Sequence, residues 1–246
     1  MTQLLDIRAG HLDLKTLRRI HEHPTALRLT AHDRGRIAVA GNLVDDIIAK
    51  GDAAYGINTG FGLLAQTRIP AEQLDLLQRN LLLSHAAGVG DALPDPVVRL
   101  ILALKINALA RGHSGITMAV IDALLALLEH EVYPVIPAQG SVGASGDLAP
   151  LAHMTLALIG EGECYYGGER MLSAVALERA GLKPISLGEK EGLALVNGTQ
   201  VMTAVAALGV LRAERLAATA DVIAAMSLES RRSAAVRAMS DSIRRR

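Results

Sequence analysis

Aromatic residues are scarce in this sequence. They make up 2% of its 246 residues, with one Phe and no Trp. A core with so few rings must be built from Ala, Val, Leu and Ile, which favours closely packed helices. Hydrophobic residues nevertheless make up 50% of the chain, and its length suffices for one large domain or two ordinary ones. The composition therefore predicts a mainly α protein.

The sequence also has a single cysteine, no net charge and no long apolar run, and each of these limits the class of protein. The single cysteine, Cys164, excludes an intrachain disulfide and fits a reducing compartment. The net charge of +0 gives no general attraction to an anionic partner. Asp6, Arg8 and Asp13 interrupt the N-terminus before a signal core could form, and no unbroken apolar run reaches the roughly 20 residues that span a bilayer. We therefore expect a cytoplasmic protein with no membrane partner.

Hydrophobic periodicity predicts most of the helices. The pattern indicates helices near residues 30–50, 71–84, 95–111 and 117–130, with a glycine-rich loop at 53–64. Residues 160–187 predict a hairpin with a short helix near 173–180. Asn197, three residues before Gln200, has the spacing of an N-cap, and we expect one long helix from there to about residue 226.

The last sixteen residues, 231–246, depart from this pattern. They contain six arginines and one Asp, with no sustained apolar face. They also lack the interleaved aromatics and the compact motif that would favour nucleic-acid binding. We expect a solvated or disordered end and no nucleic-acid partner.

Residues 140–150 (GSVGASGDLAP) are the most informative segment. Ser145 lies between Ala144 and Gly146, and these small neighbours permit a tight backbone loop. Asp147 is a good N-cap for the apolar helix that follows, which Pro150 tolerates in its first turn. The positive end of that helix favours negative charge at the loop. The segment therefore suits either an anion site or an electrophile.

Three other segments complete a pattern with this loop. They are residues 55–62 (YGINTGFG), 81–90 (LLLSHAAGVG) and 190–200 (KEGLALVNGTQ). Together the four segments resemble the histidine/phenylalanine/tyrosine ammonia-lyase family, over most of the chain up to about residue 230. In that family an Ala-Ser-Gly triplet cyclises to 4-methylideneimidazol-5-one (MIO). The resemblance implies an MIO made from Ala144, Ser145 and Gly146, with no metal or nucleotide.

The resemblance also implies roles for four further residues. Tyr55 is expected to act as the base, which requires a positive field, from the helix N-termini expected at Asp147 and Asn197, to lower the pKa of its phenol. His85 is expected to bind the substrate side chain, Asn197 to hold the ring or the amino acid, and Asp147 to assist ring formation. Each residue also has an ordinary structural interpretation: a packed aromatic for Tyr55, a cap or surface residue for His85, and N-caps for Asn197 and Asp147.

The implied fold is mainly α. It is a long-helix bundle of the ammonia-lyase/fumarase-like type, with a small α+β N-terminal part and short hairpins. We expect residues 1–115 to form an N-terminal substrate-pocket region and 116–230 to carry the MIO loop and core helices. Residues 231–246 would then be an atypical arginine-rich tail.

The implied function is deamination of L-histidine to trans-urocanate and ammonia, within a homotetramer. The pair Ser84-His85 is similar to histidine ammonia-lyases, and one imidazole can exchange an N–H···N bond with another. Family members are longer than this chain, so an inactive fragment, or a truncated or frame-shifted product, stays an alternative. A tyrosine or phenylalanine ammonia-lyase or aminomutase is a further one. The last is a serine hydrolase that uses Ser145 beside His153.

Overall fold

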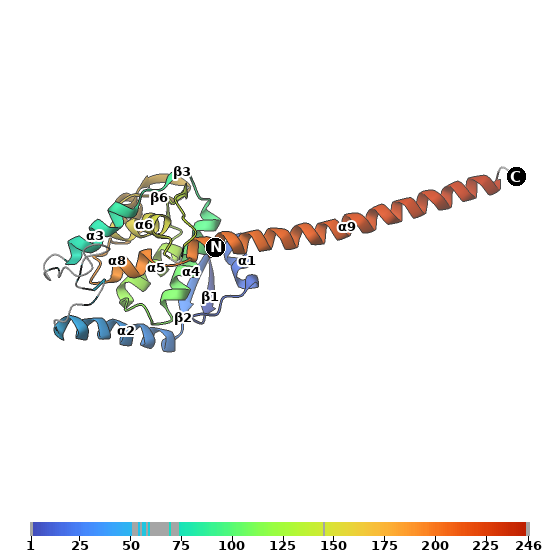
Figure 1. Cartoon of the computed structure of the whole chain (residues 1–246). Helices are drawn as coiled ribbons and strands as arrows, with labels where there is room; N and C mark the ends of the chain where they lie inside the picture. Colours follow the sequence, from blue (N-terminus) through green and yellow to red (C-terminus); the bar gives the residue numbers. More distant parts are fainter. Residues whose placement is uncertain are drawn as a thin grey trace. The chain divides into compact units, whose positions relative to one another are not determined.

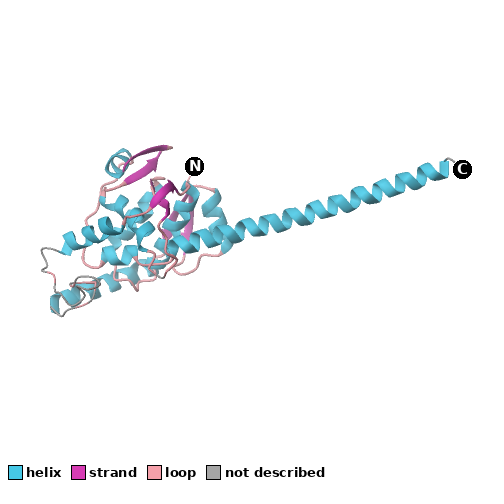
Figure 2. Ribbon diagram, turned by 45° about the horizontal axis from the view of Figure 1, so that its top comes forward, coloured by secondary structure: helices cyan, strands magenta, loops and turns pink. Residues whose placement is uncertain are grey.

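The computed structural model describes residues 2–50, 54, 56–57, 59, 69, 74–144 and 146–244. The contacts divide the chain into two compact units, Met1–Val205 and Ala206–Arg246. Helices dominate the described residues, and the strands are short (Figures 1 and 2). The predicted mainly α class is confirmed.

The N-terminal part combines two strands and a helix. Strand β1 (Gln3–Ile7) pairs in parallel with β2 (Thr25–Leu29) over its full length. Helix α1 (Leu14–Glu22) makes the crossover that parallel strands require. It begins where the side chain of Asp13 accepts a hydrogen bond from Thr16 N. This is the small α+β part that the sequence predicted.

Four of the predicted helices form close to their expected positions. They are α2 (Ala31–Lys50), α3 (Leu74–His85), α4 (Asp95–Leu109) and α5 (Met118–Glu129). Helix α4 packs against α1 and α5, and most of its residues are buried. Its fully buried leucines and isoleucines, with those of α5, build the aliphatic core that the scarcity of aromatics required.

The described residues also form two small antiparallel sheets. Strand β3 (Val89–Ala92) pairs with β5 (Pro137–Gln139), and β4 (Tyr133–Pro134), β6 (Glu163–Tyr166) and β7 (Glu169–Leu172) form the other sheet. Helix α7 (Ser173–Arg179) follows β7, so the predicted hairpin and short helix are confirmed. The β3–β5 pairing places the segment that follows α3 beside the start of the 140–150 loop.

The region around Asn197 differs from the prediction. Residues Glu191–Val196 form a separate short helix, α8, and Asn197 closes it with its N–H bonded to the carbonyl of Leu193. Helix α9 (Gln200–Arg244) begins three residues later. The prediction that Asn197 is an N-cap is therefore wrong, because the apolar run before it is itself a helix that ends there.

Helix α9 also corrects the expected disorder of the tail. It continues past residue 226 to Arg244, and the described residues from 212 onward are almost all exposed. The tail is rich in Ala and Arg, which are among the strongest helix formers, so it is helical without an apolar face to bury.

One helical segment passes a length and composition test for crossing a membrane. It is Glu191–Ser242, which takes in α8 and most of α9. The sequence predicts no such segment, because no unbroken apolar run reaches the roughly 20 residues that span a bilayer. Core helices of soluble proteins pass the same test, so the observation is weak support for a membrane span.

The 111–115 loop (RGHSG) packs closely against α2. Gly112 has a φ of +70°, and a Cβ there would lie 2.8 Å from the carbonyl oxygen of Arg36. The Arg36 guanidinium also donates to the carbonyl of Arg111. Glycine is therefore required at 112 for two reasons, its backbone conformation and the close approach of α2.

Gly181 provides a matched control for this requirement. Its φ is +71°, but a Cβ there would have no neighbour within 4 Å. We expect Gly181→Ala to lower the free energy of unfolding by about 1–2 kcal/mol, from backbone strain alone. Gly112→Ala should lower it by about 2–5 kcal/mol, because the clash with Arg36 adds to that strain. Urea unfolding of both variants measures the difference, and equal losses would contradict the close approach of α2.

Candidate functional site

The structure describes five of the seven predicted site residues. These are His85, Ala144, Gly146, Asp147 and Asn197. Tyr55 and Ser145 lie outside the described residues, so their predicted roles stay predictions. The loop that contains the triplet, residues 140–147, is called the electrophile loop below.

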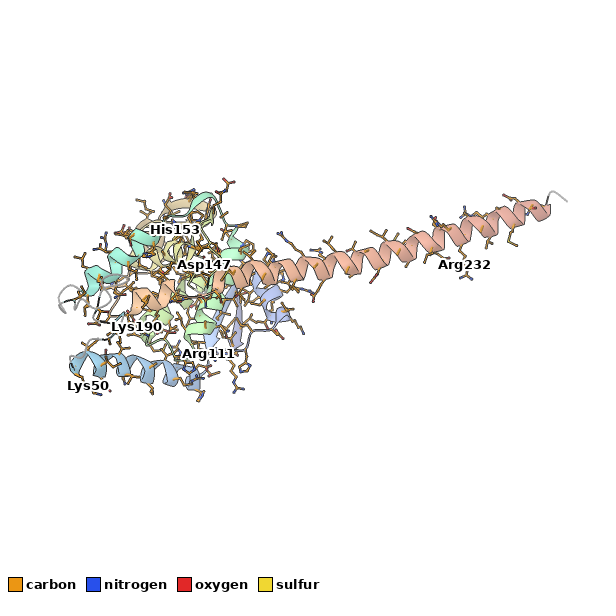
Figure 3. The ribbon with its side chains drawn as sticks, viewed as in Figure 1. Lys50, Arg111, Asp147, His153, Lys190 and Arg232 are labelled. Carbon is orange, nitrogen blue, oxygen red and sulfur yellow. The ribbon has the colours of Figure 1, made fainter. Side chains whose placement is uncertain are left out.

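Asp147 closes the electrophile loop on itself. Its buried carboxylate accepts hydrogen bonds from Ser141 Oγ at 2.7 Å and from the backbone N–H of Val142 at 3.0 Å. Asp147, labelled in Figure 3, directly precedes helix α6 (Leu148–Leu156), as predicted. Its side chain makes no capping bond to that helix. The carboxylate instead fixes the first half of the loop, and Ala144 lies exposed near its apex.

The turn between α8 and α9 contacts the other half of the loop. The N–H of Asp147 donates to the carbonyl of Gly198 at 3.1 Å. A Cβ built on Gly146 would lie 3.4 Å from Asn197 Oδ1, so the amide of Asn197 stands directly beside the triplet. The structure therefore brings Gly146, Asp147 and Asn197 together, although they are far apart in the sequence.

Gly146 carries no side chain, so nothing at that position separates its backbone from the amide of Asn197. Asn197 lies at the C-terminal end of α8, however, where the helix dipole is negative. The helix N-terminus expected at Asn197 is therefore wrong in position: the N-terminus of α6 follows the loop directly, and that of α9 begins at Gln200, three residues after Asn197.

The hydrogen bond that His85 makes at the end of α3 determines the tautomer of its imidazole. It is the last residue of α3, and its Nδ1 lies 2.8 Å from the carbonyl oxygen of Leu81. A carbonyl can only accept, so Nδ1 carries the proton of this bond and Nε2 of the neutral ring is an acceptor. The capping role and a substrate-binding role therefore use different nitrogens and are compatible.

His153 links α6 to the segment that follows His85. Its Nε2 accepts a hydrogen bond from the backbone N–H of Gly88 at 3.0 Å, and burial lowers the pKa of its imidazole. Nε2 is thus occupied by a structural bond. This disfavours the serine hydrolase alternative, in which His153 would act as the base for Ser145.

Several polar residues around α8 were not predicted from the sequence. Buried Glu191 accepts hydrogen bonds from the N–H and Oγ1 of Thr117, at 3.0 and 2.7 Å. Lys190 Nζ donates to the carbonyl of Ser114 at 2.6 Å, and Gln78 Oε1 accepts from the N–H of Leu193 at 3.3 Å. The one available indication was the presence of charged residues directly before an apolar run.

Comparison with known proteins identifies the family. The sequence model of the aromatic amino acid lyase family matches residues 12–245. The chain belongs to the aromatic amino acid lyase family. The match extends through the whole of α9, so the expectation that the resemblance stops near residue 230 is wrong.

Individual lyases and an aminomutase show the same relationship. The chain is 54% identical to a histidine ammonia-lyase of Desulfotalea psychrophila over 230 residues, which cover 94% of this chain and 45% of the relative. A solved histidine ammonia-lyase of Trypanosoma cruzi matches with a TM-score of 0.79 and 36% identity, over 87% of this chain and 41% of that one. A phenylalanine aminomutase of Pantoea agglomerans matches with a TM-score of 0.80 and 31% identity, over 86% and 41%. This aromatic amino acid lyase chain thus spans less than half the length of these relatives.

His153 predicts a pH dependence of stability. Burial lowers its folded pKa below the ordinary 6.5, so the unfolded chain binds the proton more readily. Its contribution to stability is complete above about pH 6.5 and is lost as the pH falls below that value. Urea unfolding at pH 7 and pH 5 should show a smaller decrease for His153→Gln than for the unmodified chain. The same substitution of the exposed His130 is the control, and equal decreases for His153→Gln and the unmodified chain would contradict the assignment.

Proposed function

We propose that this chain carries the ring-forming loop and the imidazole-binding residue of a histidine ammonia-lyase. The reaction is the non-oxidative elimination of ammonia from L-histidine to give trans-urocanate. The observation that carries the proposal is the position of the Asn197 amide beside Gly146. The 54% identity to a histidine ammonia-lyase supports the choice of substrate.

The proposed electrophile forms from the chain itself. The nitrogen of Gly146 bonds to the carbonyl carbon of Ala144. The oxygen of that carbonyl leaves as water with the amide hydrogens of Gly146 and Ser145, and a C=N double bond forms between the Ala144 carbon and the Ser145 nitrogen. A second water takes the hydroxyl of Ser145 and the hydrogen of its Cα, which leaves a methylidene group. The MIO ring would supply an electrophile that captures the amino acid, and the scheme requires no metal or nucleotide.

The described residues suit this scheme in three ways. Gly146 presents no side chain to the closing ring, and Asp147 holds the front of the loop through Ser141 and Val142. Nε2 of His85 can accept a hydrogen bond from the N–H of a substrate imidazole, whereas a phenyl ring has no N–H to donate. Tyr55 is proposed as the base.

The assembly state and location are also proposals. A homotetramer would bring further groups to the site, and the chain spans 45% of the Desulfotalea psychrophila relative, so such groups could come from outside it. Activity of the 246-residue chain alone is therefore a separate question from formation of its ring. A cytoplasmic location stays a prediction.

Mass spectrometry of the peptide that covers residues 140–150 tests ring formation directly. We expect the peptide from the purified chain to be lighter than its sequence requires by two water molecules. Ser145→Ala should abolish this deficit, because it removes the hydroxyl that leaves as the second water. An intact, uncyclised peptide in the unmodified chain would overturn the proposed function.

Substrate choice is tested by binding of L-histidine. His85→Phe removes the acceptor Nε2, and we expect it to weaken L-histidine binding about tenfold in calorimetric titration, the value of one hydrogen bond. Ser84→Ala is the matched control, because it leaves the bond between His85 and Leu81 in place. Equal affinities of His85→Phe and Ser84→Ala for L-histidine would argue against an imidazole substrate.

A further inference from the structure

Lys105 is a fully buried lysine in the core helix α4. Its side chain is 1% exposed, and its Nζ donates hydrogen bonds to two backbone carbonyls, those of Ala194 at 2.8 Å and Asn197 at 3.1 Å. Burial lowers the pKa of its ammonium from 10.5 to about 7. A neutral amine retains two N–H donors, so either protonation state can make both bonds.

The two carbonyls that Lys105 binds lie at the end of α8. The last carbonyls of a helix have no partner within that helix, and a buried carbonyl without a partner is costly. Helix α8 has only six residues, and the Asn197 N–H already closes it on Leu193. Lys105, which lies on α4, therefore caps the C-terminal end of α8. This role accounts for a buried lysine in the apolar helix α4.

With this cap in place, hydrogen bonds hold the backbone of Asn197 and of the residue that follows it. Its N–H is bonded to Leu193, its carbonyl to Lys105, and the following carbonyl, of Gly198, accepts from Asp147. Its side-chain amide then lies beside Gly146. Loss of the Lys105 bonds would free the Asn197 carbonyl and weaken the neighbouring bond from the N–H of Asp147 to the carbonyl of Gly198.

We infer that Lys105 is a positioning residue for ring formation. By binding the carbonyls of Ala194 and Asn197, it holds the amide of Asn197 against Gly146 while the ring closes. The inference rests on the proposed function, because it assigns Lys105 a part in the same cyclisation. Lys105 touches neither the triplet nor the substrate, so it acts through Asn197.

Lys190 offers a matched control at the other end of α8. It is a part-buried lysine that also donates to a backbone carbonyl, that of Ser114. It precedes α8, whereas Asn197 follows it. Leu102→Ala supplies a second control, because Leu102 is fully buried one turn before Lys105 in α4 and its truncation destabilises the core.

The test follows ring formation in the full 246-residue chain. Each variant is synthesised in a short isotope pulse and chased, and the mass of the 140–150 peptide is recorded over time. We expect Lys105→Met to form the ring about 10–100-fold more slowly than the unmodified chain, the effect of a small misplacement at a reacting site. Lys190→Met and Leu102→Ala should cyclise at nearly the unmodified rate. Hydrogen exchange of the Asp147 amide should be faster in Lys105→Met only.

The outcomes separate this inference from the proposed function. Normal cyclisation in Lys105→Met would overturn the inference and leave the proposed function standing. No ring in the unmodified chain would overturn both. Equal slowing in Lys105→Met and Leu102→Ala would show that Lys105 acts through stability alone, which contradicts the inference. Lys105→Gln serves as a second variant, and if neither variant folds by circular dichroism, the role is general to the fold and the inference fails.

Discussion

The hydrogen bond from the N–H of Asp147 to the carbonyl of Gly198 joins the two segments that make up the candidate site. On one side of it lies the electrophile loop, which the carboxylate of Asp147 closes through Ser141 and Val142. On the other side lies the turn between α8 and α9, which carries Asn197. Every contact proposed for ring formation depends on the relative position of these two segments.

That position depends in turn on α8, a helix too short to be stable alone. Hydrogen bonds of polar side chains join it to three other parts of the fold. Gln78 on α3 binds its first turn, Glu191 joins it to the start of α5, and Lys105 on α4 binds its last carbonyls. Buried polar groups of this kind specify a single arrangement only when their partners are present. The aliphatic core stabilises the fold, and these hydrogen bonds fix the position of the turn between α8 and α9.

The helices of the core could be predicted because their periodicity reflects burial of one face, as in α4 and α5. Helix α8 could not, because it has only six residues and the spacing of Asn197 and Gln200 was interpreted as the start of the long helix. The helical tail was missed because the absence of an apolar face was given more weight than propensity. The family motifs named His85, Asn197 and Asp147, but not their partners. Leu81 and Ser141 are local partners, four and six residues from His85 and Asp147. Lys105 and Gly198 meet Asn197 and Asp147 only through tertiary packing, which no local pattern encodes.

The central claim is that the fold of this chain brings the triplet into position for cyclisation beside Asn197. A crystal structure of the 246-residue chain at a resolution that separates individual atoms tests it most directly. The account predicts a covalent bond between the nitrogen of Gly146 and the carbonyl carbon of Ala144, with the Asn197 amide in contact with the ring. An open triplet, with Asp147 still bonded to Gly198, would contradict it.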